Sequence, residues 1–382
     1  MKRLLVKVLV FTLVLCNLFT HISCNANLAG DVNSDGKIST VDYFIIKKYV
    51  LGVKELTNNQ LSRADSDGDG KIDQADFIAL KPIPQDNSSA TIYQLSTSDD
   101  ALMMSYLIVT GNGNVIMIDG GMTGSSSYNI LYNQLKRYGK IKDRDNVVDA
   151  WIFTHPHNDH VKAFCYIWQQ HPELEIKNFY YNFPTEQEIL AMPKEEHVYT
   201  EDLAFFINTF NKNKESDTAF DEYPEVQEGD SFTIDGVKFE ILQTYESWSS
   251  LCKNVDDSSM VVKMTAGGQS VLFLGDLRED GGKILLEKYS DELKSDIVQM
   301  SRHGQNGVEK EVYEAINPQI CLWPTPLWVW ESNVSTKEIK GWMQDIGVKY
   351  HNTMREGWMD EKYNSLNLSE NSIAIPCEYV VK

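Results

Sequence analysis

Three histidines and an aspartate stand within one six-residue stretch, directly after an apolar segment. The residues are His155, His157, Asp159 and His160, and the apolar segment is Val147–Thr154. This segment is typical of a buried strand, and a bend after such a strand can aim several side chains at one point. Imidazole and carboxylate groups are ligands that zinc and iron take in proteins. The stretch therefore predicts a metal site, and the competing interpretation is a polar surface loop.

Composition limits the class of protein. The chain has 382 residues, of which 42% are hydrophobic and 24% charged, as expected for a globular protein of two domains. The net charge of -20 argues against nonspecific wrapping of duplex DNA, which requires a basic surface. The cysteines after residue 26 are scattered and form no C-x-x-C pair, so we expect neither a disulfide framework nor a thiolate zinc site.

Residues 1–26 have the pattern of a signal peptide. A basic start precedes the apolar run Leu4–Phe19, and small or polar residues follow it. The run is short for a membrane span, although an uncleaved anchor helix is the alternative. A weak resemblance to a lipoprotein processing site at Ile22–Cys24 is a second alternative. We expect cleavage after Ala26, a secreted product and no stable membrane span.

Two twelve-residue segments, Asp31–Asp42 and Asp65–Asp76, repeat the same spacing of acidic and amide side chains. Each has a glycine at its sixth position, Gly36 or Gly70, which permits a sharp turn. Calcium binds six to eight oxygens in loops of this kind. The predicted calcium ligands, with a backbone carbonyl at each lysine, are Asp31, Asn33, Asp35, Lys37, Asp42, Asp65, Asp67, Asp69, Lys71 and Asp76.

This pair of loops resembles a type I dockerin, a small all-α calcium-binding module that binds cohesin domains on a cellulosome scaffoldin. The resemblance covers about residues 28–84. It implies two Ca²⁺ ions, a dockerin over 27–84 and a cohesin-binding face at Thr40, Val41, Lys47 and Lys48. A linker rich in proline and serine follows the dockerin, and we expect it at residues 85–90. The second domain is then expected over residues 91–382.

The second domain alternates predicted strands with predicted helices, which indicates an α/β fold. Ligand-type residues follow several of the strands: an Asp-Gly-Gly turn at Asp119, a Gly-Asp pair at Asp276 and an Arg-His-Gly segment at His303. Open sheets place their sites at such strand ends. We therefore expect these residues to join the histidine stretch.

These motifs together resemble those of the metallo-β-lactamase-fold hydrolases, over about residues 92–380. The resemblance implies an αββα sandwich with a dinuclear metal site. His155 and His157 would bind the first ion, and Asp159, His160 and His303 the second, with Asp276 between them. We expect one or two Zn²⁺ ions, with manganese or iron as alternatives.

One ligand of that family is missing. The family has a histidine some twenty residues before the shared aspartate, and this chain has Asn254–Ser259 there instead. The first ion would then have His155, His157, Asp276 and solvent. Asp256 or Asp257 could compensate, or each is a solvated loop acid. This variant is most similar to the ComEC-like domains of competence proteins and to phosphorylcholine esterases, which implies phosphodiester chemistry.

Two further sets of residues are candidates for substrate contacts. Arg302 replaces a histidine of those relatives, and its planar guanidinium suits a phosphate oxygen; a solvated surface arginine is the alternative. Trp328 and Trp330 lie in an aromatic run that could line a cleft, and core packing is the alternative. We expect Asp159 to orient the nucleophile.

Three functions remain open. The first is a secreted, cellulosome-associated hydrolase of phosphodiesters or of phosphorylated cell-wall or glycan substrates. The second is an ester, lactone or amide hydrolase of the same fold. The third is a non-catalytic cellulosome module with a decayed metal site, which the missing histidine permits.

Overall fold

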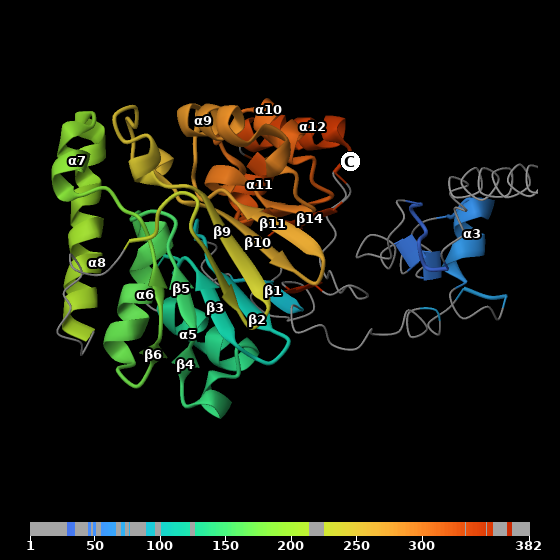
Figure 1. The fold of residues 1–382 in the computed structure, drawn as a ribbon, viewed down its shortest axis with the longest axis horizontal. Helices are drawn as coiled ribbons and strands as arrows, with labels where there is room; N and C mark the ends of the chain where they lie inside the picture. The colour runs from blue at the N-terminus through green and yellow to red at the C-terminus, as the bar shows by residue number, and fades with distance from the viewer. Residues whose placement is uncertain are drawn as a thin grey trace, which may run out of the picture. The chain divides into compact units, whose positions relative to one another are not determined.

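The computed structural model forms two compact units, residues 1–81 and 82–382 (Figure 1). The segment predicted as a signal peptide, residues 1–26, lies outside the described residues. Those are 29–34, 45–46, 49–50, 55–65, 70–72, 76, 89–95, 101–122, 127–213, 225–332, 334–348, 350–353 and 365–368. No helix within these ranges is long and apolar enough to span a membrane.

The N-terminal unit shows the turn that the calcium-loop pattern predicts. Gly70 has a φ of 83°, and its N–H donates to Asp65 Oδ2 at 2.9 Å. Asp31 and Asp76 are buried although both are acidic. Helix α3, Asn58–Ala64, begins at a capping box. Several predicted calcium or cohesin positions lie outside the described residues: Asp35, Lys37, Thr40, Val41, Asp42, Lys47, Lys48, Asp67 and Asp69.

The first sheet of the C-terminal unit is mixed. β3 pairs antiparallel with β2 and parallel with β5, so the polarity of the sheet changes at β3. All four residues of β3 are buried, because helices cover one face of the sheet and the second sheet covers the other. In spatial order the strands are β15 (Ser365–Leu368), β1 (Ala90–Gln94), β2 (Tyr106–Thr110), β3 (Val115–Ile118), β5 (Ala150–Ile152) and β7 (Phe179–Tyr180).

The second sheet is antiparallel from β8 to β11 and parallel from β11 to β14. Its strands are β14 (Tyr350–Thr353), β13 (Ile320–Trp323), β12 (Ile297–Gln299), β11 (Gln269–Phe273), β10 (Val261–Ala266), β9 (Val237–Gln243) and β8 (Ser231–Ile234). A two-stranded sheet joins β4 (Val147–Val148) to β6 (Glu175–Ile176).

Helices form the two outer layers, which Figure 1 shows on opposite sides of the sheets. Those packed on the first sheet include α5 (Ser127–Tyr138), α6 (Asn158–Gln170), α7 (Glu186–Ala191) and α8 (Tyr199–Asn213). The second sheet carries α9 (Glu279–Tyr289), α10 (Lys310–Ile316), α11 (Leu327–Ser332) and α12 (Val334–Ile346).

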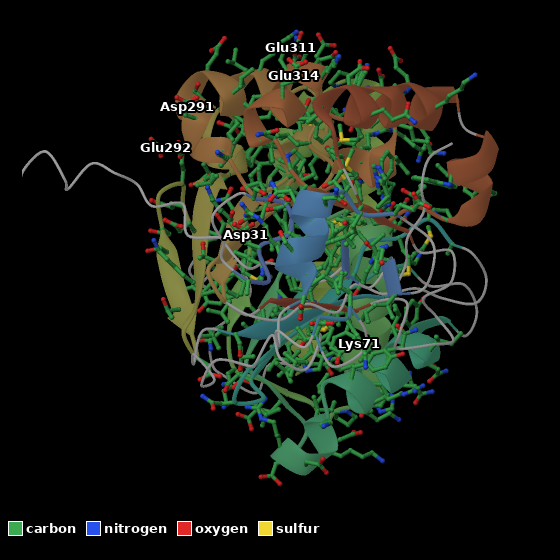
Figure 2. All side chains as sticks on the ribbon, turned by 90° about the vertical axis from the view of Figure 1, so that its right-hand side faces the viewer. Asp31, Lys71, Asp291, Glu292, Glu311 and Glu314 are labelled. Atoms are coloured by element: carbon green, nitrogen blue, oxygen red, sulfur yellow. The ribbon has the colours of Figure 1, made fainter. Side chains whose placement is uncertain are left out.

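The two sheets face each other. The rings of Tyr106 and Phe273 meet edge to face with centroids 5.4 Å apart, and the Gln94 side chain donates to the backbone oxygen of Trp323 at 2.8 Å. The predicted αββα sandwich is therefore confirmed. Acidic side chains project from its surface, for example Glu311 and Glu314 on α10 (Figure 2).

The strand predicted over Val147–Thr154 is divided. β4 and β5 belong to different sheets, and Asp149 lies between them. Its buried carboxylate accepts the N–H of Val115 at 2.8 Å and pairs with Arg144 at 2.7 Å. The Asp149 carboxylate thus accepts the Val115 N–H, which the backbone of a neighbouring strand would accept if the strand were continuous.

Candidate metal centre

The predicted metal ligands come together at the carboxyl ends of strands from both sheets. The histidine stretch follows β5 and enters the first turn of α6. Asp276 follows β11, and His303 lies in the 3-10 turn η7, Ser301–Gly304, after β12. Long-range folding therefore joins three loops that are far apart in the sequence.

One cluster consists of Asp159, His160, Asp276 and His303. His303 Nε2 is 3.1 Å from Asp159 Oδ2 and 3.5 Å from Asp276 Oδ2. His160 Nε2 is 3.3 Å from Asp276 Oδ1. These are the residues that the family resemblance implies for the second ion.

The other cluster consists of His155, His157 and Asp256. His157 Nδ1 is 3.1 Å from Asp256 Oδ1. The rings of His155 and His160 have centroids 4.1 Å apart, so the two clusters are neighbours. Asp256 thus occupies the side of the centre where the sequence lacks a histidine.

Asp257 has a different role. Its Oδ1 accepts the N–H groups of Arg278 and Gly281 at 2.8 and 3.2 Å, and its Oδ2 accepts from the Asn254 amide at 2.7 Å. A carboxylate at the first turn of α9 stabilises the N-terminus of that helix. Of the two aspartates left open by the sequence, only Asp256 faces the histidines.

The imidazole orientations suit a metal centre. His160 Nδ1 is 2.7 Å from Asp119 Oδ2, and His303 Nδ1 is 2.8 Å from the backbone oxygen of Pro324. His155 Nδ1 lies 3.1 Å from the Thr154 hydroxyl. Partners of this kind hold the proton on Nδ1 and leave Nε2 available as a ligand, as in known metal sites.

Four buried polar atoms at the centre have no hydrogen-bond partner among the described residues. They are Nε2 of His155, His157 and His160, and Oδ1 of Asp276. Buried polar atoms are normally paired, so several unpaired ones at one place indicate a ligand. Metal bonds of about 2.0–2.1 Å in a tetrahedral site place donor atoms roughly 3.3–3.4 Å apart. The donor separations of 3.1–3.5 Å fit that requirement.

The backbone next to the centre adopts rare conformations. Arg302 and His303 have φ values of 50° and 56°, in the left-handed region that L-residues seldom occupy. Gly304 follows with a φ of 73°, and a Cβ there would lie 2.3 Å from the Trp323 ring. Such strain is concentrated at functional sites, where the surrounding structure enforces it.

Buried charges perturb the centre. Burial and the neighbouring imidazoles of His160 and His157 hold the pKa of His155 well below its ordinary value. Burial also opposes protonation of His303, but Asp276 and Asp159 outweigh it and raise the pKa of His303 to about 10. Although burial disfavours its charge, the Asp276 carboxyl has a pKa well below the usual range because His303 and His160 flank it.

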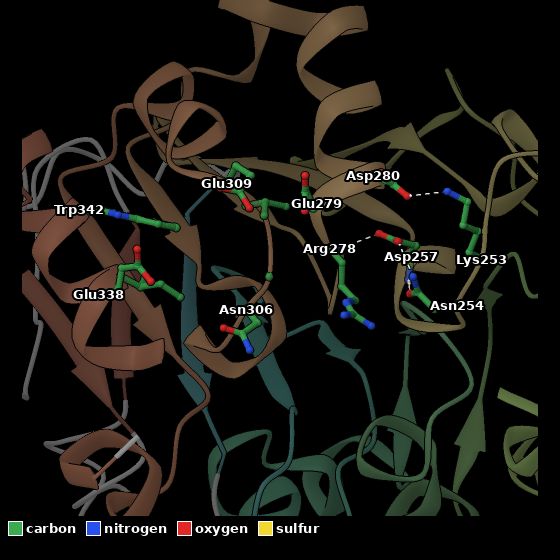
Figure 3. A pocket seen from close by; sticks show the side chains of 13 residues that line it. Lys253, Asn254, Asp257, Arg278, Glu279, Asp280, Asn306, Glu309, Glu338 and Trp342 are labelled. Carbon is green, nitrogen blue, oxygen red and sulfur yellow. Dashed lines mark hydrogen bonds and ion pairs between the residues drawn. The ribbon is translucent and has the colours of Figure 1, made fainter. Parts of the chain in front are cut away.

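Two arginines meet at Asp256. Arg302 Nε is 2.8 Å from Asp256 Oδ2, and a terminal nitrogen of Arg278 is 3.8 Å from the same oxygen. Arg278 also lines a cavity of about 530 Å³ whose lining includes none of the clustered histidines or carboxylates, and Figure 3 shows it between Asn254 and Asn306. Arg302 is therefore at the centre rather than on a distant solvated surface.

The two predicted tryptophan contacts differ. Trp330 is 3% exposed and packs edge to face on Trp323, so it belongs to the core and cannot line an open cleft. Trp328 is 54% exposed. The alternative of core packing thus holds for Trp330.

Three further residues shape the centre: the sequence placed Asp119 near the histidine stretch without giving it a role, and it did not single out Arg278 or Tyr199. Asp119 accepts Thr154 N–H and O–H groups as well as facing His160. Arg278 and Tyr199 also belong here, since the Tyr199 ring lies 3.8 Å from the His157 ring by centroids. The Asp-Gly-Gly turn was a signal for Asp119; local sequence carries none for the other two.

Comparisons with known proteins match both units. The family model of the dockerin type I domain matches residues 29–82, and that of the metallo-beta-lactamase superfamily matches residues 104–253. ComE operon protein 3 of Bacillus subtilis (strain 168) is 25% identical over 178 residues, which cover 46% of this chain and 20% of that protein. Competence protein ComA of Neisseria gonorrhoeae is 36% identical over 91 residues, covering 23% and 12% respectively.

The chain matches only a fifth or less of the length of these two relatives. Among solved structures, the metallo-beta-lactamase fold protein YhfI from Bacillus subtilis aligns with a TM-score of 0.44 at 11% identity, covering 73% of this chain and 99% of that one. A diphosphatase of the PhnP family aligns with a TM-score of 0.33 at 13% identity, covering 61% and 85%. The chain thus contains a segment that matches the dockerin type I domain, followed by one that matches the metallo-β-lactamase superfamily, and its competence-protein relatives fit the ComEC-like subgroup.

Proposed function

We propose that the C-terminal unit is a metal-dependent hydrolase with its centre at the two histidine and carboxylate clusters. The observation that supports this most strongly is the set of buried, unpaired donor atoms that converge there. Two divalent ions fit the donor set, and zinc suits the imidazoles. The proposed ligands are His155, His157, Asp159, His160, Asp276 and His303.

Bound divalent ions would supply Lewis acidity and a hydroxide nucleophile near neutral pH, because they lower the pKa of water from about 15.7 to about 7. The protein residues hold and orient the reacting groups. Asp159, at the edge of its cluster and less buried than the histidines, is placed to accept a hydrogen bond from the attacking water. Asp119 and the Pro324 carbonyl keep His160 and His303 in one tautomer.

We infer a phosphodiester or a phosphorylated cell-wall or glycan substrate. The support is the pair of guanidinium groups of Arg302 and Arg278 beside the centre, since arginine binds phosphate oxygens through its planar fork. The Arg302 side chain uses Nε for Asp256, and its terminal nitrogens make no hydrogen bond with the other described residues. Those nitrogens are the proposed contacts to a phosphate oxygen.

Turnover of two chromogenic substrates tests this function. The metal-loaded chain should hydrolyse bis-p-nitrophenyl phosphate faster than p-nitrophenyl acetate. Replacing Arg302 with glutamine should lower kcat/KM for the phosphodiester by about a hundredfold, and Arg302→Lys should retain part of it. Hydrolysis of the acetate alone would support an ester hydrolase instead. If no transition metal is bound after metal-replete purification, the result would support a non-catalytic module instead.

We also propose that the N-terminal unit binds a cohesin in a calcium-dependent manner, which would tether a secreted enzyme to a scaffoldin. Its match to the dockerin family supports this, as does the Gly70 turn beside Asp65. The acidic loop side chains repel one another without Ca²⁺, so folding of this unit should require the ion. Cohesin affinity that is unchanged by chelator would contradict the proposal.

A further inference from the structure

The side of the centre that lacks the family histidine is filled by a carboxylate. Asp256 Oδ1 lies 3.1 Å from His157 Nδ1, a separation that fits two ligands of one ion, with His157 coordinating through Nδ1 and not through the Nε2 atom that His155 and His160 offer. Asp256 is 7% exposed, and a carboxylate this buried is normally paired or bound to a metal. It stands 99 residues beyond His157 in the sequence, so only folding brings the two together.

The second oxygen of Asp256 is occupied. Oδ2 accepts the Arg302 Nε–H at 2.8 Å, and Arg278 approaches the same oxygen at 3.8 Å. Ligating carboxylates are commonly held in this way by groups outside the coordination shell. The arrangement turns Oδ1 toward the histidines and leaves it as the donor atom.

On the basis of the proposed hydrolase function, we propose that Asp256 is the third protein ligand of the first metal ion, held in place by Arg302 and Arg278 as positioning residues. Each cluster then has two imidazoles and one carboxylate of its own. Asp276, whose Oδ1 lies 3.3 Å from His160 Nε2, is an additional carboxylate of the second cluster. The two sites become alike in composition, so both should fill rather than one.

A carboxylate in place of an imidazole changes the metal preference. Carboxylate ligands suit Mn²⁺, whereas imidazole suits zinc and iron. The ratio of Mn²⁺ affinity to Zn²⁺ affinity should therefore be higher at the first site than at a site with three histidines. The extra negative charge of Asp256 is offset by the two guanidinium groups, which keeps the centre attractive to an anionic substrate.

Metal counting on the full chain tests the assignment. Protein stripped with chelator and returned to calcium buffer would be titrated with Mn²⁺ and Zn²⁺ by calorimetry, with bound metal counted by mass spectrometry. The wild-type chain should bind two Mn²⁺ ions beyond calcium. Asp256→Ala should bind one, with affinity for the other at least about tenfold weaker. Asp256→His should bind two and shift the preference toward zinc.

Matched variants separate a ligand role from a structural one. Asp280→Asn, on a half-exposed side chain paired with Lys253, should change neither metal count nor preference. Arg302→Gln should weaken Mn²⁺ binding about 10- to 100-fold and Arg302→Lys should recover part of it, while the melting temperature without metal changes little. Two ions bound with unchanged affinity in Asp256→Ala, or no shift toward zinc in Asp256→His, would overturn the assignment. A wild-type chain that binds no transition metal would instead refute the proposed function.

Discussion

The carboxylate of Asp119 holds His160 in the tautomer that a metal needs. It is fully buried, its Oδ2 lies 2.7 Å from His160 Nδ1, and it accepts two hydrogen bonds from Thr154. In Asp119→Asn the amide keeps nearly the same shape, but its NH₂ group cannot accept. If the amide oxygen keeps the Thr154 N–H, the NH₂ group faces His160 Nδ1 and favours the tautomer with the proton on Nε2.

That proton would block the nitrogen that faces Asp276. Loss of such a partner typically costs 10- to 100-fold in metal affinity, which corresponds to about 1.4–2.7 kcal/mol. Calorimetric titration of the stripped protein with Zn²⁺ would measure it. Asp149→Asn is a matched control, because Asp149 is also a buried, hydrogen-bonded carboxylate but lies in a separate network with Arg144 and Lys177.

The control variant should lose thermal stability without losing metal affinity. Wild-type metal affinity in Asp119→Asn would refute the role given to this carboxylate. An equal loss in both variants would show that general destabilisation, rather than the tautomer of His160, sets the affinity.

A tight glycine, the protonated histidines of the centre and a buried histidine elsewhere can each be tested. Gly304→Ala should lower the free energy of unfolding by about 1–3 kcal/mol, because the new Cβ would overlap the buried Trp323 ring. The control is Gly347→Ala, which has a similar φ and no close neighbour and should lower the free energy of unfolding by less; thermal unfolding would measure both. Metal affinity should rise with pH, because His160 and His303 have raised pKa values, about 10 for His303, and must release protons to bind a metal ion. Calorimetry in buffers of different ionisation enthalpy would count the released protons. A metal affinity that does not change with pH would contradict the assignment. Burial lowers the pKa of His351 to about 4, compared with about 6.5 in the unfolded chain. Its contribution to the free energy of unfolding, about 3 kcal/mol, is therefore fully present above pH 6.5 and is lost as the pH falls to 4. His351→Asn should flatten this part of the acid unfolding curve.

Local sequence was sufficient for features that depend on short-range spacing. The histidine stretch predicted a metal cluster because an apolar strand followed by a turn keeps neighbouring side chains together, and the structure places His155, His157, Asp159 and His160 in two adjoining ligand clusters. The Gly70 turn followed from the calcium-loop pattern for the same reason. Family resemblance added Asp276 and His303, which no local spacing connects to the stretch.

Tertiary structure alone decided between residues that the sequence leaves equivalent. Asp256 and Asp257 are neighbours of the same type, yet one faces His157 and the other stabilises the start of α9. Trp330 belongs to the core, and Trp328 is exposed, although only one residue separates them. Metal-ligand chemistry depends on residue types and can be predicted from them. Which of two like residues a fold turns inward depends on partners many residues away, and their positions are set only when the two sheets pack.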